Sequence, residues 1–198
     1  MDTIRNTISS FEKLKKTKYR IVLSAGRGKP LEEILLNFYD DDLYHILGLQ
    51  HLLDIILPKN KINLLSYVKN GIITDNSLSI SEYYDNKSLG YNIKLRIKMA
   101  GNLEEFLDSE DFTVSIYKLQ HSDHTLIQAD YLITCKCNSY KEDYYIFIRK
   151  RTEDDTYGIV SCFIKEANTY WGGKRYLMLK EKINGDKTIV QYKHPNYK

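Results

Sequence analysis

The spacing of apolar residues divides the chain into a helix-rich first half and a strand-rich second half. Apolar side chains recur at helical spacing across Thr3–Lys15, which predicts a first helix there. From Phe112 onward they recur at about every second position, the period of a strand with one buried face. The strands predicted by this second pattern are Phe112–Leu119, Ala129–Cys137, Tyr144–Arg151, Gly158–Lys165, Tyr176–Ile183 and Thr188–Lys193.

The first half also contains strand-like and further helical segments. Tyr19–Ser24 has the composition of a short strand, and Ile34–Tyr39 is either a second strand or a helix end, with a strand favoured. A helix then begins at three consecutive aspartates, whose charge suits a helix N-terminus, and it ends before Pro58. Three more helices are predicted, over Lys59–Asn70, Asn76–Asp85 and Tyr91–Asp108.

The short connections in the second half predict an antiparallel meander. The turn Asn184-Gly185-Asp186 contains Asn-Gly, a strong signal for a tight hairpin. Consecutive strands joined by short connections pair antiparallel. We therefore predict a single α+β domain over residues 1–198. Its mainly helical part, residues 1–110, is expected to pack on one face of an antiparallel sheet formed by residues 111–194.

Composition narrows the functional class only slightly. The 198 residues are 42% hydrophobic and 28% charged, as in an ordinary soluble protein, and the net charge is only +3. No apolar run approaches the roughly 20 residues that a membrane helix needs, and the first residues lack the apolar stretch of a signal peptide. We expect a cytoplasmic protein with no membrane partner. A cluster of lysines and arginines without acids, within residues 13–29, either contacts phosphates or is a solvated surface.

The cysteines do not indicate a metal site. Cys135 and Cys137 would share one face of a strand, whereas zinc ligands usually sit at wider spacing on turns. Together with Cys162 they are expected to be reduced, small buried residues. No metal or cofactor is predicted.

The segment Asp42–Ile55 contains, among its leucines, polar side chains that can take part in catalysis. His45 lies one helical turn from the preceding aspartates and one turn from Gly48, which removes bulk beside the imidazole. His45 is therefore a candidate catalytic residue, with a buried histidine bonded to a carbonyl as the alternative. His51 lies about 120° further round an ideal helix, so a structural or surface role is favoured for it, with Asp54 able to orient its ring.

The same segment resembles a known family signature. The residues Phe38-Tyr39 and Leu43-Tyr44-His45-Ile46-Leu47-Gly48-Leu49-Gln50-His51-Leu52-Leu53-Asp54-Ile55 are similar to "FYHLxGLxxLxDI" of the fourth phage-associated group of Barnase–EndoU–Colicin–RelE-like (BECR) nucleases. Shorter similarities extend the resemblance over roughly residues 10–185; they are Gly71-Ile72-Ile73-Thr74 followed by Ser81, Lys94-Leu95-Arg96-Ile97, Asp130-Tyr131-Leu132-Ile133, Ser161-Cys162-Phe163 and Tyr176-Leu177-Met178-Leu179-Lys180. The resemblance implies helices packed on a four- or five-stranded antiparallel sheet and metal-independent cleavage of RNA. It also implies that the protein is encoded by a phage or another mobile element. Some relatives act as toxins or effectors, so a neutralising antitoxin or immunity protein is a possible partner.

Metal-independent RNA cleavage requires a base, an acid and cations around the phosphate. The 2′-hydroxyl attacks the adjacent phosphate and a 2′,3′-cyclic phosphate is formed, for which histidine suits proton transfer and lysine or arginine suits charge stabilisation. The candidate catalytic residues are His45, Lys180, Ser161 and Tyr176. The candidate substrate-binding residues are Arg96, Arg149, Arg151, Lys182, Tyr131 and Arg175.

Alternatives remain for each of these residues. Alternating lysine and tyrosine is also typical of the solvent-facing side of a sheet. Arg96 can instead pack on the face of a helix. The aromatic residues of the loop Tyr170-Trp171-Gly172-Gly173 can stack on bases. We therefore predict that an imidazole from the first half lies opposite cations from the second.

Other nuclease and hydrolase motifs are missing from the sequence. It contains no Gly-x-x-x-x-Gly-Lys loop, Gly-x-Ser-x-Gly elbow or His-Glu-x-x-His helix, and no Glu-x-Lys follows a strand-borne aspartate. The main competing function is a non-catalytic RNA- or protein-binding module on a BECR-like fold.

Overall fold

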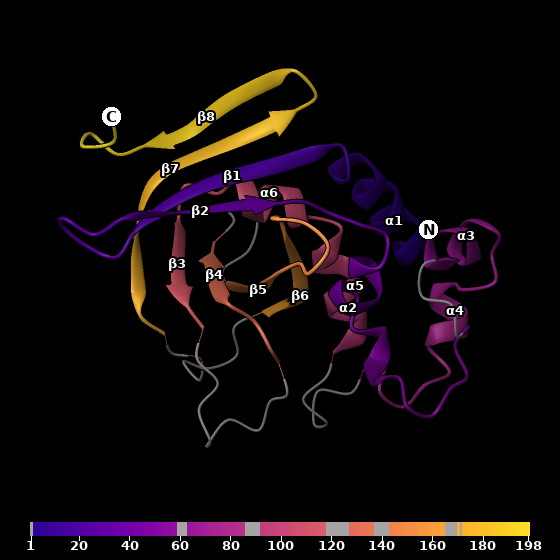
Figure 1. Ribbon diagram of the computed structural model, residues 1–198. Coiled ribbons are helices and arrows are strands. Elements are labelled where there is room, and N and C mark those ends of the chain that lie inside the picture. Colours follow the sequence, from indigo (N-terminus) through magenta and orange to yellow (C-terminus); the bar gives the residue numbers. More distant parts are fainter. Residues whose placement is uncertain are drawn as a thin grey trace.

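The computed structural model describes residues 2–58, 63–85, 92–117, 127–136, 143–164, 170 and 172–198 (Figure 1). The helices are α1 (Thr3–Leu14), α2 (Asp42–Ile46), α3 (Leu64–Lys69), α4 (Asp75–Leu78), α5 (Ile93–Ala100) and α6 (Leu103–Asp108), with a 3₁₀ turn η1 (Leu49–His51). The strands are β1 (Thr17–Ser24), β2 (Leu31–Leu36), β3 (Phe112–Ile116), β4 (Tyr131–Cys135), β5 (Tyr144–Lys150), β6 (Tyr157–Ile164), β7 (Lys174–Asn184) and β8 (Lys187–Lys193).

The strands close into a barrel. Their order is β1-β2-β6-β5-β4-β3-β7-β8, and β1 also pairs with β7, so the first seven strands of this order form a ring. The ring closes between β2 and β6 through a parallel contact of Leu36 with Tyr157. β8 pairs only with β7 in the described part of the chain and extends beyond the ring, as Figure 1 shows. Closure leaves β8 as the exposed edge of the sheet.

The predicted fold class, helices packed on one face of a C-terminal antiparallel sheet, is wrong. Two strands of the barrel, β1 and β2, come from the part of the chain that was expected to be mainly helical. β1 pairs antiparallel with β2 on one side and with β7 on the other. The pairing with β7 runs from Thr17 opposite Asn184 to Ser24 opposite Tyr176. The predicted antiparallel pairing holds from β3 to β6, and the hairpin predicted at Asn184-Gly185-Asp186 joins β7 to β8. The meander is interrupted between β6 and β7, because β7 pairs with β3 and β1 rather than with β6.

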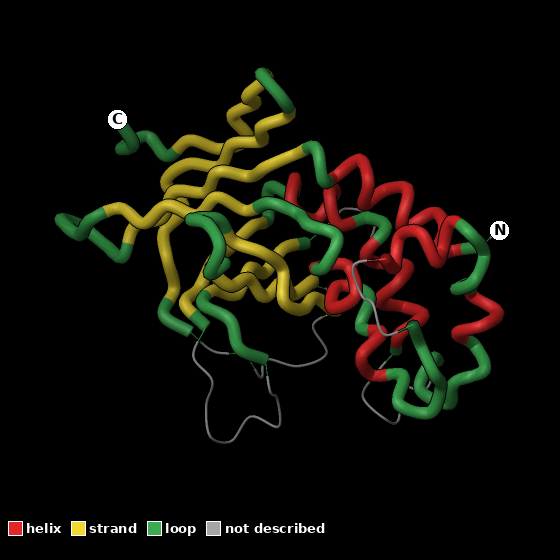
Figure 2. Tube along the Cα trace, turned by 45° about the vertical axis from the view of Figure 1, so that its right-hand side comes forward, coloured by secondary structure: helices red, strands yellow, loops and turns green. Residues whose placement is uncertain are grey.

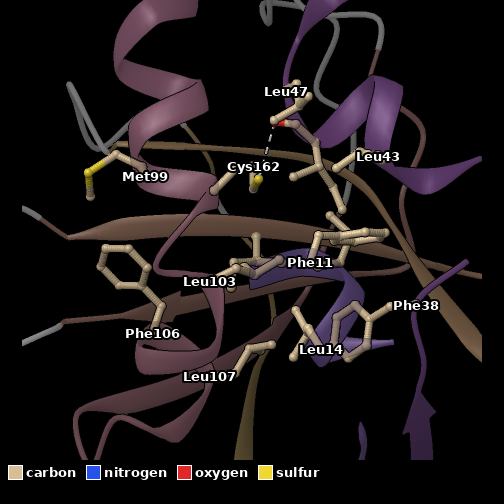
Figure 3. Close-up of a cluster of buried hydrophobic side chains, with 14 of the residues drawn as sticks. Phe11, Leu14, Phe38, Leu43, Leu47, Met99, Leu103, Phe106, Leu107 and Cys162 are labelled. Carbon is tan, nitrogen blue, oxygen red and sulfur yellow. Dashed lines mark hydrogen bonds between the residues drawn. The ribbon is translucent and has the colours of Figure 1, made fainter. Parts of the chain in front are cut away.

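One core fills the barrel and the space beneath the helices. Inward side chains of the strands meet side chains of α1, α2, α5 and α6 in one buried cluster, part of which is drawn in Figure 3. Figure 2 shows the helices grouped together on one side of the strands. Within this core, Cys162 of β6 donates a weak hydrogen bond to the carbonyl oxygen of Ile46, 3.6 Å away. That contact joins the end of α2 to a barrel strand.

A second, smaller cluster covers the outward face of part of the barrel. It consists largely of aromatic residues from β5, β6 and their neighbours, with Tyr145 and Phe147 buried among them. Cys135 and Cys162 are free and buried, as expected, whereas Cys137 lies outside the described residues. In the ranges that the structure describes, no helix is both long enough and apolar enough to cross a membrane.

Candidate functional site

A glycine breaks the histidine segment into two short pieces. The predicted helix over Asp42–Ile55 is wrong, because α2 stops at Ile46 and the chain passes through Gly48 with φ of 73°. A positive φ is easy for glycine and strained for other residues. The following turn, η1, places His51 close enough to His45 for the charge of one imidazole to lower the pKa of the other. The break therefore leaves the two imidazoles within electrostatic reach of each other.

A β-bulge positions Ser161 on the outward face of the barrel. The register of β5 and β6 shifts so that Ile148 is opposite Ile159 but Phe147 is opposite Ser161, which leaves residue 160 without an opposite residue. Alternate residues of a strand point to opposite faces of the sheet. The extra residue therefore reverses the face to which each later side chain of β6 points. Ile159 points into the main core, whereas Phe163, two residues after Ser161, packs against the outer aromatic cluster.

Arg96 of α5 connects these two features. Its Nη2 donates to the carbonyl oxygen of His45 at 3.2 Å and to the hydroxyl oxygen of Ser161 at 3.1 Å. The residue is only 7% exposed, and its Cζ lies 5.6 Å from the ring centroid of Phe163. A Cβ at Gly48 would lie 2.7 Å from Arg96 Nε, so the glycine also makes room for the guanidinium. Of the residues predicted to form the site, Arg96 and Ser161 thus meet through their side chains, and His45 contacts Arg96 through its backbone carbonyl oxygen.

The imidazole of His51 is held in its neutral form. Burial, the positive charge of Arg96 and that of His45 lower the pKa of His51 to about 4. The amide nitrogen of Gln50 lies 3.3 Å from His51 Nε2 and can only donate, so this ring nitrogen accepts. The amide oxygen of Gln50 is buried and has no partner in the described structure.

Removing the charge of Arg96 is expected to raise the pKa of His51 from about 4 towards 6.5. The variant Arg96→Gln keeps a polar, although shorter, side chain while it eliminates the cation that opposes protonation. The pKa is measured from the NMR shift of the His51 ring proton as the pH is changed, with His194→Ala as a guide to assignment. An unchanged pKa in Arg96→Gln would show that the charge of Arg96 does not act on this imidazole.

Two of the predicted sheet cations instead hold α6. Lys180 is only 2% exposed and donates to the carbonyl oxygens of Leu107 at 2.9 Å and Ser109 at 2.6 Å. Burial lowers the pKa of Lys180 to about 8. Lys182 contacts Asp108 at 2.5 Å. A cation at a helix C-terminus offsets the partial negative charge there, so both lysines have a structural explanation.

Three further candidates form polar contacts with other parts of the chain. Tyr131 and Arg175 both contact Glu32 of β2, at 3.0 Å each, within the barrel wall. Arg151 forms an ion pair with Asp42 at 2.5 Å. None of these three contacts involves His45, Arg96 or Ser161.

The last two candidates are exposed. Arg149 lies on β5, two residues beyond Phe147, and its side chain is therefore on the outward face of the barrel. Tyr176 is 58% exposed on β7. Asp54 does not orient His51, because its carboxylate accepts hydrogen bonds from Ser81 and from the backbone nitrogen of Glu82.

The sequence prediction gave His51 a structural or surface role and assigned no role to Gln50. Both belong to a segment that was treated as one continuous helix, and the signal for the break was Gly48 in mid-segment. In the described ranges, no three His, Cys, Asp or Glu side chains come together in a way that could hold a metal ion.

Comparison with known proteins identifies the family. No curated protein and no solved structure matches the chain. A family model matches residues 3–198, nearly the whole length, and its description is phage-Barnase-EndoU-ColicinE5/D-RelE like nuclease 4. The resemblance drawn from the histidine segment is therefore confirmed. The chain belongs to this fourth phage-associated family of BECR-like nucleases.

Proposed function

We propose that this nuclease cleaves RNA without a metal ion, at the cluster formed by His45, His51, Arg96 and Ser161. The observation that carries the proposal is the buried guanidinium of Arg96, which is held between the histidine segment and Ser161. A cation and a neutral imidazole side by side are the groups that phosphodiester cleavage by a 2′-hydroxyl requires.

The cluster offers a group for each part of the reaction. His51, neutral at physiological pH, accepts the proton of the 2′-hydroxyl at Nε2, where the hydroxyl takes the place of the Gln50 amide, while the 2′-oxygen forms a bond to phosphorus. The bond from phosphorus to the 5′-oxygen breaks, and His45 donates a proton to that oxygen. Arg96 stabilises the negative charge on the phosphate, and the hydroxyl of Ser161 holds the guanidinium in place. The products are a 2′,3′-cyclic phosphate and a 5′-hydroxyl.

The positions of the two imidazoles support opposite roles for them. A positive charge on His45 lowers the pKa of His51, so a protonated His45 favours a neutral His51. Arg149, on the outward strand face beyond Phe147, is a further candidate for binding the RNA backbone.

The products of the reaction test this proposal. Purified protein with excess EDTA is incubated with an RNA oligonucleotide and with the same oligonucleotide carrying 2′-deoxyribose throughout. We expect cleavage of the RNA only, with cyclic phosphate ends detected by mass spectrometry. Cleavage of the deoxy substrate, or loss of activity with EDTA, would exclude this mechanism. Binding of RNA without any product would favour the non-catalytic module.

The biological setting is a further part of the proposal. A role as a phage or mobile-element toxin or effector in the cytoplasm, with a neutralising protein partner, is motivated by membership of the family.

A further inference from the structure

The strand β8 has one side that no described element covers. It pairs with β7 along its whole length, from Lys187 opposite Asn184 to Lys193 opposite Leu179, and it has no second neighbour among the described strands. Figure 1 shows β8 at the top of the molecule, with no described helix or strand beyond it. Every second residue of such a strand directs its N–H and C=O away from its neighbour. The outer side of β8 therefore presents a row of unpaired backbone groups.

Contacts with the rest of the protein hold this edge in place. A register shift leaves Gln191 without an opposite residue on β7, and its Nε2 donates to Oδ1 of Asp108 at 2.7 Å, which joins β8 to the end of α6. Beyond the strand, the backbone nitrogen of His194 donates to the carbonyl oxygen of Met178 at 2.8 Å. The edge is thus preformed, which reduces the entropy that a binding partner must overcome.

The middle of β8 is apolar and uncharged. Ile189, Val190 and Tyr192 are 59%, 54% and 40% exposed. Proteins usually protect an exposed edge strand with proline or with charged side chains, and the residues between Lys187 and Lys193 include neither. The bulge bends the strand but leaves Ile189 and Val190 in regular register with β7. Such an edge favours pairing with a further strand.

The charges at the two ends of β8 indicate which strand fits. Lys187 and Lys193 are both exposed, and neither forms an ion pair within the part of the chain that the structure describes. Residues 187–198 contain no aspartate or glutamate. If two copies of β8 paired antiparallel about Val190, Lys187 of each copy would lie opposite Lys193 of the other. Like charges directly opposite are destabilising, so the lysines disfavour a second copy and favour an acidic strand.

We propose that β8 binds an extended, acidic segment of another protein, which pairs antiparallel with it as an additional strand of the sheet. The main chain of the partner pairs with the N–H and C=O groups on the outer side of β8. Its carboxylates lie opposite Lys187 and Lys193, and uncharged side chains between them cover Ile189 and Val190. The proposal rests on the edge of the sheet alone and is independent of the ribonuclease mechanism.

Two synthetic peptides test the edge. The full-length chain, labelled with nitrogen-15, is titrated with Glu-Thr-Val-Thr-Val-Thr-Glu and with Lys-Thr-Val-Thr-Val-Thr-Lys, and binding is followed by the NMR shifts of the backbone amides. We expect the acidic peptide to shift the amide signals of β8 and to slow their hydrogen exchange. Because two attractive charge pairs replace two repulsive ones, it should bind roughly tenfold more tightly than the lysine peptide.

Reversal of the charges on β8 provides the decisive comparison. The double variant Lys187→Glu with Lys193→Glu should prefer the lysine peptide. The control, Lys13→Glu with Lys98→Glu, changes the net charge by the same amount at exposed lysines of α1 and α5, and it should keep the preference of the wild type. Circular dichroism verifies that both variants are folded, so a reversed preference reflects the charges on β8.

Four results would overturn the proposal. The first is the absence of binding of either peptide at about 1 mM, and the second is binding that shifts amides outside β8 only. The third is a peptide preference that the double variant leaves unchanged. The fourth is a different occupant of the edge. A dimer detected by sedimentation and abolished by Val190→Lys would identify a second copy, whereas the same β8 shifts with an RNA oligonucleotide would identify RNA.

Discussion

Replacement of His51 with alanine is expected to lower kcat for RNA cleavage by about 10²–10⁴-fold, the usual contribution of a positioned general base. The pKa of His51 is lowered to about 4 by burial and by the charges of Arg96 and His45, so this imidazole is ready to accept a proton at neutral pH. The rate is measured with a fluorescently labelled RNA under saturating conditions, and circular dichroism verifies that the variant is folded.

His194→Ala is the matched control, because this histidine lies after β8 and its ring accepts a hydrogen bond from Asn196. It should leave the rate within twofold of the wild type. The pH profile adds a second criterion. If His51 is the base, kcat/KM should decrease towards acidic pH with a midpoint near pH 4 rather than near 6.5. Full activity in His51→Ala would show that His51 is not the general base.

Replacement of Arg151 with methionine is expected to lower the free energy of unfolding by about 3–5 kcal/mol, because it leaves a buried carboxylate without its cation. The side chains of Arg151 and Asp42 are only 10% and 7% exposed. Arg151 also donates to the side chain of Asn37 at 3.1 Å and lies 4.1 Å from the ring centroid of Tyr39. Urea denaturation measures the loss of stability.

Arg149→Met is the control, since Arg149 lies two residues earlier, near the end of β5, and is exposed. Its replacement should change the stability by less than about 0.5 kcal/mol. Burial raises the pKa of Asp42, and Arg151 opposes this rise. Without Arg151 the carboxylate is protonated more readily in the folded state, and a neutral carboxyl group needs no cation. The loss of stability in Arg151→Met should therefore be smaller at pH 4 than at pH 7. A loss that does not depend on pH would argue that packing, not the ion pair, is responsible.

Most of the elements were predictable from the sequence, but their arrangement was not. The alternation of apolar residues located β1 and β3 to β8 to within a few residues. It does not identify the partner of a strand, because the same period suits an open sheet and a closed barrel. The decisive contact is the pairing of β1 with β7, between segments about 160 residues apart, and no local pattern indicates it.

The candidate site was predictable in part for similar reasons. His45, Arg96 and Ser161 were identified from the family signature and from their chemistry, and the structure brings them together. Lys180 and Arg151 have the same chemical character, yet both are paired inside the structure. A residue's type shows what it can do in a reaction, whereas its burial and its partners depend on tertiary contacts. The bulge before Ser161 is also a tertiary effect, because it exists only as a register shift against β5.

Closure of the barrel by β7 has a consequence during protein synthesis. β1 leaves the ribosome early, yet one of its two neighbours is encoded near the end of the chain. Until residues 174–184 have been translated, β1 and β3 lack the strand that lies between them. The long separation in sequence makes this closure a slow step relative to local helix formation. A nascent chain of this nuclease therefore cannot close its barrel before β7 has been translated, which delays completion of the scaffold that holds the candidate site.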